Sequence, residues 1–263
     1  MSAKTTGEIV SLFDSYGRQA RLFPALLTLL PPLLTALAWF PALIESHSAG
    51  SLLTLSVSCG LLYALSSWTR TKGRRLEQRL VRKWGGWPTT LLMRHSGDLN
   101  PHIRRRCHQY LSNKVPKLQF PSPEEEQDNP AAADAIYEAA IAWLRENTRE
   151  KKFAMVAREN AQYGFRRNLL SLKPLGVTGC TLALVCASLA VLAQYPDIGT
   201  AASEDRSRDI ILYFLKVEPQ RLASLFLDVG AIVAWLAIVT GKWVREAGFL
   251  YANALLATCD NAD

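Results

Sequence analysis

Residues 22–44 read LFPALLTLLPPLLTALAWFPALI, and this uninterrupted apolar stretch decides the fold class. It contains no charged side chain, and it exceeds the roughly 20 residues that a helix needs to cross a hydrocarbon core about 30 Å thick. A segment inside lipid must be helical, because its backbone groups have no water to bond. The stretch therefore predicts a transmembrane helix over residues 22–44.

Three further segments have the same character. Residues 50–68 are uncharged but richer in serine and threonine, residues 174–194 are uncharged, and residues 222–241 contain one acid, Asp228. Together the four segments predict an all-α polytopic membrane protein with four transmembrane helices in two hairpins. Four such helices in a soluble protein of 263 residues would leave little polar surface to cover them.

Lysine and arginine are distributed unevenly along the chain, whose net charge is +7. Residues 69–173 hold 21 of the 30, and the tails at 1–21 and 242–263 add three and two, whereas residues 195–221 hold four. The positive-inside rule places both termini and the insert at 69–173 in the cytoplasm, with 195–221 as an extracytoplasmic loop. We expect a multi-pass protein of a cell membrane, with a bacterial inner membrane favoured.

The insert at residues 69–173 is predicted to be a basic, helical cytoplasmic domain. Its first helix continues the second span and is broken by the glycine pair at 85–86. Later helices are predicted to start at Asn100-Pro101, at the capping box of Ser122 to Glu125 and at Asn129-Pro130. No strand pattern is visible.

Both tails predict further helices. Residues 1–21 form an amphipathic pattern that suits either the membrane surface or packing on the cytoplasmic domain. Residues 242–263 are predicted to extend the fourth span into the cytoplasm as a C-terminal helix.

Asp228 is the one acid inside the predicted spans. An acid at the centre of a membrane helix costs about 2.5–3.5 kcal/mol and is usually paired or functional. Its side chain is a candidate pore-lining acid, proton site or subunit contact, and a hydrated acid near the interface is the alternative. Its expected partners are hydroxyl groups such as those of Thr28, Thr54 and Ser58.

Small side chains recur at helix-packing spacing in the second and third predicted spans. Such faces let two helices approach closely, either within one chain or between copies, and they favour a homo-oligomer. The residues are Ser56, Gly60, Ala64, Gly176, Gly179 and Ala183.

A third candidate precedes the third span, where residues 160–170 read NAQYGFRRNLL. Glycine inside a helix costs about 1 kcal/mol relative to alanine, so a glycine here predicts either a kink that couples the domain to the membrane or a contact between subunits. An interfacial anchor of aromatic and arginine side chains is the alternative. The coupling residues are Tyr163, Gly164, Phe165, Arg166 and Arg167.

Basic clusters predict the partners. Seven basic residues between positions 70 and 83 face one acid, Glu77, which suits anionic lipid at the cytoplasmic face of the bilayer. The triplet Arg104, Arg105 and Arg106 is a candidate contact for a ligand or for a soluble cytoplasmic protein. Nucleic acid is less favoured, because no recognised binding fold accompanies the charge.

Catalytic and metal-binding patterns are absent from the sequence, which has no Walker A loop, GxSxG, HExxH or kinase motifs. His95, Asp98, His102, Cys107 and His108 cluster without zinc-site spacing, and the chain has no CxxC pair. We therefore expect a non-enzymatic protein with no metal site and no cofactor.

The predicted topology resembles small multi-pass effectors of bacterial anti-phage systems, which join a cytoplasmic sensing region to a few membrane helices. This resemblance covers topology alone and implies no site residue. Two hypotheses follow. In one, the protein oligomerises and its cytoplasmic domain senses or recruits a partner. In the other, it is a regulated pore or membrane-disrupting effector with Asp228 and the second span along the path.

Overall fold

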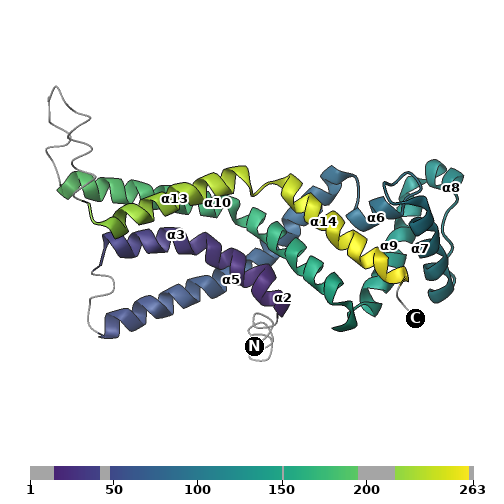
Figure 1. Cartoon of the computed structure of the whole chain (residues 1–263), viewed down its shortest axis with the longest axis horizontal. Coiled ribbons are helices and arrows are strands. Elements are labelled where there is room, and N and C mark those ends of the chain that lie inside the picture. Colours follow the sequence, from purple (N-terminus) through teal and green to yellow (C-terminus); the bar gives the residue numbers. More distant parts are fainter. Residues whose placement is uncertain (1–14, 42–47, 150, 195–216, 261–263) are drawn as a thin grey trace, which may run out of the picture.

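The computed structural model describes residues 15–41, 48–149, 151–194 and 217–260, and every secondary-structure element within these ranges is helical. Figure 1 shows an elongated molecule with long helices at one end and short helices at the other. The elements are α2 (Ser15–Gly17), η1 (Arg18–Leu22), α3 (Phe23–Trp39), α5 (Ser48–Trp84), α6 (Pro88–Met93), α7 (Pro101–Lys114), α8 (Pro123–Asp128), α9 (Pro130–Asn147), η2 (Lys151–Phe153), α10 (Ala154–Gln194), α13 (Pro219–Ala237), α14 (Gly241–Leu256) and η3 (Ala257–Asp260).

Three helical stretches of the described chain are long and apolar enough to cross a membrane, namely Ser15–Trp39, Ala154–Val191 and Pro219–Ala237. They overlap the first, third and fourth predicted spans, and each ends three to five residues before the predicted end. The second predicted span lies at the start of α5, where most side chains up to residue 58 lie outside the described part of the chain. The all-helical prediction is confirmed, and three apolar helices indicate a membrane protein.

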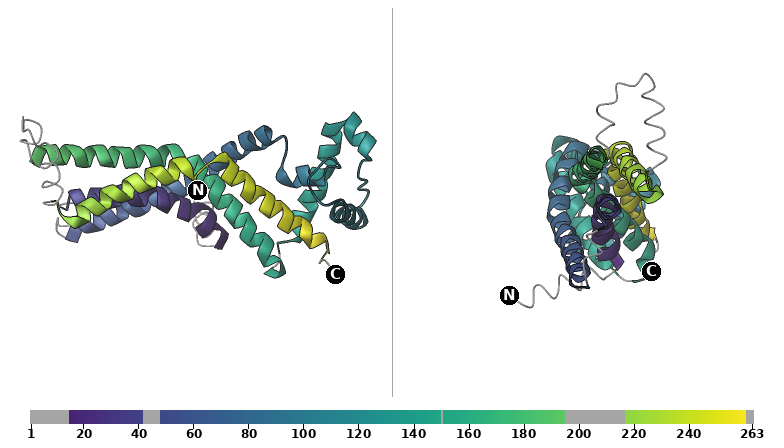
Figure 2. Two further views of the ribbon diagram at one scale, coloured as in Figure 1. Left: turned by 45° about the horizontal axis from the view of Figure 1, so that its top comes forward. Right: turned by 90° about the vertical axis from the view of Figure 1, so that its left-hand side faces the viewer.

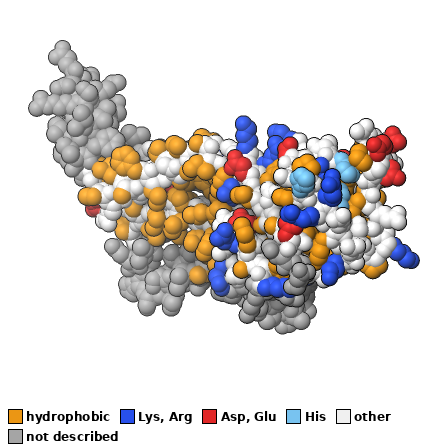
Figure 3. Space-filling model, turned by 45° about the vertical axis from the view of Figure 1, so that its right-hand side comes forward, with side chains coloured by type: hydrophobic (Ala, Val, Ile, Leu, Met, Phe, Trp, Pro, Cys, Tyr) orange, Lys and Arg blue, Asp and Glu red, His pale blue; other side chains and the backbone are white. Residues whose placement is uncertain are grey.

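The apolar bundle consists of α3, α13, the first half of α5 and the second half of α10, which lie along one another in Figures 1 and 2. Large apolar side chains point outward from these helices, with Leu182 64% and Phe226 74% exposed. Figure 3 shows hydrophobic side chains gathered over this end and charged side chains over the other. A surface of this kind is solvated by lipid tails and is rare on soluble proteins.

Helices α5 and α10 run through both ends of the molecule. At 1.5 Å per residue, the 37 residues of α5 extend about 55 Å and the 41 residues of α10 about 60 Å. Helix α5 ends at Trp84, because the next residues, Gly85 and Gly86, have positive φ angles of 84° and 149°. The predicted break at this glycine pair is therefore present.

The predicted starts of three short helices are also present. The Asn100 side chain accepts a hydrogen bond from the His102 amide, and the Asn129 side chain accepts one from the Ala132 amide. Ser122 and Glu125 form the reciprocal capping box. These caps define the short helices α7, α8 and α9 on the polar side of the molecule.

The polar domain consists of α6 to α9, α14 and η3, together with the ends of α5 and α10 that reach them. Its core joins residues far apart in the sequence, since helix α14 and η3 pack against α6, α7 and α9. The fully or almost fully buried members include Met93, Cys107, Leu111, Tyr137, Ile141, Leu144, Leu255 and Leu256.

The C-terminal segment differs from its prediction as a continuation of the fourth span. Helix α13 ends at Ala237, and α14 starts separately at Gly241. The side chain of Thr240 accepts a hydrogen bond from the Trp243 amide and so caps the new helix. This cap lets α14 change direction and enter the polar domain. Residues 1–14 of the predicted N-terminal helix lie outside the described residues.

Candidate functional site

The junction between the apolar bundle and the polar domain is fastened by a buried ion pair. Arg167 of α10 donates a hydrogen bond from Nη1 to Oε1 of Glu77 on α5, over 2.7 Å. Both side chains are only 13% exposed. If either partner of such a buried pair were removed, the other charge would remain desolvated and uncompensated.

A second contact at the junction brings backbones together. Asn168, 1% exposed, donates a hydrogen bond to the carbonyl oxygen of Ala20 over 2.5 Å. On its other side it lies against Gly73 of α5, where an added Cβ would collide with the Asn168 amide. Helices α5, α10 and η1 are therefore packed at a distance that only glycine allows at position 73.

The coupling residues predicted from the NAQYGFRRNLL segment all lie at this junction but face different partners. Gly164 does not interrupt α10, since the helix runs unbroken through it. An added Cβ there would lie 2.9 Å from Ala20 Cβ and 2.9 Å from Tyr16 Oη. Gly164 is therefore a position of close approach between α10 and the helix that starts at Ser15.

The other members of the segment contact α14. The Tyr163 ring stacks on Tyr251 with centroids 6.4 Å apart, and the Phe165 ring meets Trp243 edge-on at 6.3 Å. Arg166 donates to the Trp243 carbonyl over 3.1 Å and lies over its ring. Sequence reasoning missed the partners of this segment because they are distant from it along the chain, and these partners are Gly73, Glu77, Trp243 and Tyr251.

Asp228 lies in the apolar bundle as the tenth residue of α13, which begins at Pro219, and this places it about 14 Å along the helix axis from that start. Its side chain is fully buried within the chain. Oδ2 accepts a hydrogen bond of 2.6 Å from Thr35 of α3.

The sequence predicted the hydroxyl groups of Thr28, Thr54 and Ser58, and not that of Thr35, as hydrogen-bond partners of Asp228. Thr28 donates instead to the carbonyl oxygen of Pro24, four residues earlier in its own helix, over 2.7 Å. The side chains of Thr54 and Ser58 lie outside the described part. The second oxygen, Oδ1, is buried without a hydrogen-bond partner among the described residues. A buried carboxylate with an unsatisfied oxygen carries a large desolvation cost.

The small residues predicted for helix packing divide into two groups. Gly176 is closed by the Trp235 ring of α13, and Gly179 faces Pro32 of α3 at 3.6 Å from an added Cβ. Ala183 is partly buried, and Gly60 and Ala64 are exposed on α5. Gly60 has no neighbour within 4 Å of an added Cβ, and the Ser56 side chain lies outside the described part. The face on α10 is therefore used within the chain.

The arginine triplet of α7 does not form one binding surface. Arg104 donates to the carbonyl oxygens of Gly97 and Leu99 and so holds the preceding loop. Arg106 makes two hydrogen bonds of 2.9 Å to Asp260. Arg105 is exposed, and its side chain has no hydrogen bond to another of the described residues.

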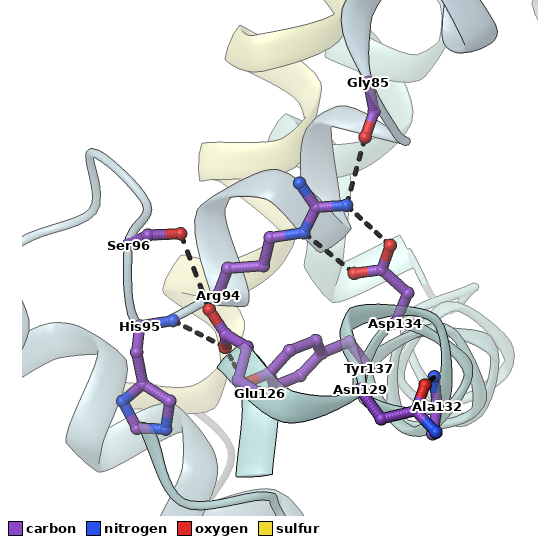
Figure 4. A network of polar contacts seen from close by, with 9 residues as sticks. All are labelled: Gly85, Arg94, His95, Ser96, Glu126, Asn129, Ala132, Asp134 and Tyr137. Atoms are coloured by element: carbon purple, nitrogen blue, oxygen red, sulfur yellow. Dashed lines mark hydrogen bonds and ion pairs between the residues drawn. The ribbon is translucent and has the colours of Figure 1, made fainter. Parts of the chain in front are cut away.

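A polar network holds the loop after α6 against α8 and α9 (Figure 4). Arg94 bonds both oxygens of Asp134 and the Gly85 carbonyl. Glu126 accepts hydrogen bonds from the His95 amide and from Tyr137 Oη. Burial acts to raise the pKa of Glu126, but these hydrogen bonds prevail and hold the pKa below its ordinary value. The network satisfies its own groups and serves the fold.

No cluster of three or more potential metal ligands occurs among the described residues. His108, one of the clustered histidines, stacks on Phe120 with centroids 4.2 Å apart, and its Nε2 lies 3.1 Å from the Met93 carbonyl oxygen. Burial lowers the pKa of His108 to about 4, so the ring is neutral and packs as part of the core.

Comparison with known proteins adds no relative. No protein-family model matches the chain, and neither a curated protein nor a solved structure is significantly similar to it.

Proposed function

We propose that the chain is a non-enzymatic multi-pass membrane protein that oligomerises and whose cytoplasmic helical domain senses or recruits a partner. In this proposal the start of α5 is a fourth transmembrane helix, so that α3 with α5 and α10 with α13 form two hairpins. Both termini and the polar domain lie in the cytoplasm. The bacterial inner membrane is the favoured location, and the basic surface of the polar domain supports the orientation.

The buried Glu77–Arg167 pair is the observation that carries this proposal. A simple membrane anchor needs only a flexible linker to its soluble domain. Here two long helices pass from the domain into the bundle without interruption, and they are fastened where they meet. A rearrangement of the domain on binding a partner would therefore change the packing of the membrane helices.

Oligomerisation is supported by the surface of α5. Gly60 and Ala64 are exposed one helical turn apart, and Leu61 beside them is 55% exposed. The matching small residues of α10, Gly176 and Gly179, are already covered within the chain. Among the predicted small-residue positions in the described part of the chain, those of α5 are exposed, and a second copy would contact them through close backbone approach.

The orientation predicts which epitope tags can be reached in intact cells. A tag inserted at Lys117, in the exposed loop between α7 and α8, should react with an antibody only after the membrane is permeabilised. The same tag inserted between residues 204 and 205 should react before permeabilisation, because this segment is the proposed outside loop. Labelling of the Lys117 tag in unpermeabilised cells would overturn the proposed topology.

A regulated pore is the second candidate function, and the buried Asp228 carboxylate favours it. The wild-type protein in liposomes should then release an entrapped dye or ions when a cytoplasmic ligand is added, and Asp228→Asn should change that flux by about tenfold or more. Asp128→Asn, which neutralises an exposed acid at the end of α8, is the control. A protein that stays silent under all ligands, or a flux that Asp228→Asn leaves unaltered, argues for the recruiting function.

A further inference from the structure

An arginine-lined groove of about 1160 Å³ opens beside the junction. Its walls come from the helix that starts at Ser15, from α5, from the end of α9 and from the first turns of α10. The basic lining residues are Arg21, Arg70, Arg145, Arg149 and Arg158.

The charge in this groove is of one sign. No aspartate or glutamate belongs to the described lining. Arg149 and Arg158 have carboxylate partners on their own segments, at 3.9 Å and 3.3 Å, in pairs that leave both guanidinium groups mostly exposed. Arg70 and Arg145 have no carboxylate within ion-pair distance among the described residues. Solvent ions or an anionic ligand would offset the charges of Arg70 and Arg145 in this groove.

Keeping basic residues on the cytoplasmic side of a membrane does not require that several arginines line one groove. The positive-inside rule depends on the number of charges near the helix ends and not on their convergence. Here arginines from four separate elements line one hollow, together with Gln19, Asn160 and Tyr251. Planar guanidinium groups and neutral hydrogen-bond donors are the groups that bind phosphate oxygens.

We propose that the groove binds a phosphate-bearing anion, either a small soluble molecule or the headgroup of an anionic phospholipid. Both sources offer the same oxygens to the same arginines. The lipid source is within reach because Arg21 and Arg70 lie next to the first two predicted spans. This inference rests on the proposed function and names the chemistry that the cytoplasmic domain recognises.

The position of the groove gives the ligand a route to the membrane helices. A smaller pocket of about 250 Å³ shares Arg145, Asn160 and Tyr251 with the groove and is also lined by Glu77 and Arg167. An anion bound by Arg145 therefore lies beside the smaller pocket, which is also lined by the Glu77–Arg167 pair that joins α5 to α10. Its negative charge would compete with Glu77 for the nearby guanidinium groups.

The test uses the full chain in nanodiscs of zwitterionic phosphatidylcholine. Inorganic pyrophosphate and ATP are the soluble probes, and their binding is measured by titration calorimetry. In a second arm the protein is incubated with phosphatidylglycerol vesicles, and retained lipids are counted by native mass spectrometry. The groove variant is Arg70→Gln with Arg145→Gln. The matched control, Arg79→Gln with Arg105→Gln, removes the same charge from exposed positions on α5 and α7 outside the groove.

Loss of binding in the groove variant, by about tenfold or more, with the control nearly unchanged, supports the proposal. A loss confined to the pyrophosphate or ATP arm assigns a soluble ligand, and a loss confined to the phosphatidylglycerol arm assigns a lipid headgroup. Equal losses in both variants, or no binding in either arm, would overturn it. Arg145→Gln alone, at an exposed position of α9, repeats the test should the double variant fold poorly. Tag accessibility and flux are separate readouts, so failure here leaves the proposed function standing.

Discussion

Arg167→Met should reduce the free energy of unfolding by about 3–5 kcal/mol, because it leaves the Glu77 carboxylate buried and uncompensated. The loss is expected to be this large since Glu77 is only 13% exposed and has little access to water. Unfolding of the purified protein in detergent, followed by circular dichroism during denaturant titration, measures the effect. Adding Glu77→Gln to Arg167→Met should recover a large part of the loss, because the stranded charge is then removed.

Arg149→Met is the control for this prediction. It makes the same substitution at an ion pair with Glu146, whose two side chains are 78% and 73% exposed. An exposed pair contributes at most about 1 kcal/mol, so the unfolding free energy should barely change. Similar losses for Arg149→Met and Arg167→Met would show that the junction pair is no stronger than a surface contact.

Gly73→Ala should also destabilise the protein strongly, by about 1–3 kcal/mol or more, since the added methyl group has no space beside Asn168. To admit it, Asn168 must move away from α5 and weaken its hydrogen bond to the Ala20 carbonyl. The backbone contact between α5 and α10 would then open. Thermal unfolding of the detergent-purified variant provides the measurement.

Gly60→Ala is the companion substitution, on the same helix but at an open position. Nothing lies within 4 Å of its added Cβ, and alanine favours the helix over glycine by up to about 1 kcal/mol. The monomer should therefore keep or raise its unfolding temperature. If Gly73→Ala were equally harmless, the packing described at the junction would be incorrect. A loss at Gly60 together with a smaller assembly would instead support the proposed contact between copies.

Much of the fold follows from local sequence signals. The apolar runs predict the membrane helices because length and composition alone decide whether a segment suits lipid. The helix starts at Asn100, Ser122 and Asn129 are predictable because each cap acts on amides two or three residues away. The separate start of α14 was not predicted. Thr240 is an N-cap residue of the same kind, but it directly follows the apolar residues of the fourth predicted span.

The junction was only half predictable. The unusual composition around Tyr163 and Arg167 marked one side of it correctly. Glu77 was visible only as one acid among basic residues, and its pairing with Arg167 spans 90 positions along the chain. The same holds for Thr35 and Asp228, which lie 193 positions apart. Pairs of this kind are set by how helices cross, and periodicity along one helix contains no information on crossing.

The core of the polar domain is completed by the last part of the chain, since Leu255, Leu256 and Cys259 pack among residues of α7 and α9. Residues 69–173 are therefore synthesised before α14 and η3, which complete the core of the domain. In the proposed topology, α14 and η3 follow the second hairpin along the chain. The polar domain can therefore complete its core only after that hairpin has been synthesised. A chain terminated before α14 would reach the membrane yet expose the apolar face of α7 and α9 to cellular proteases.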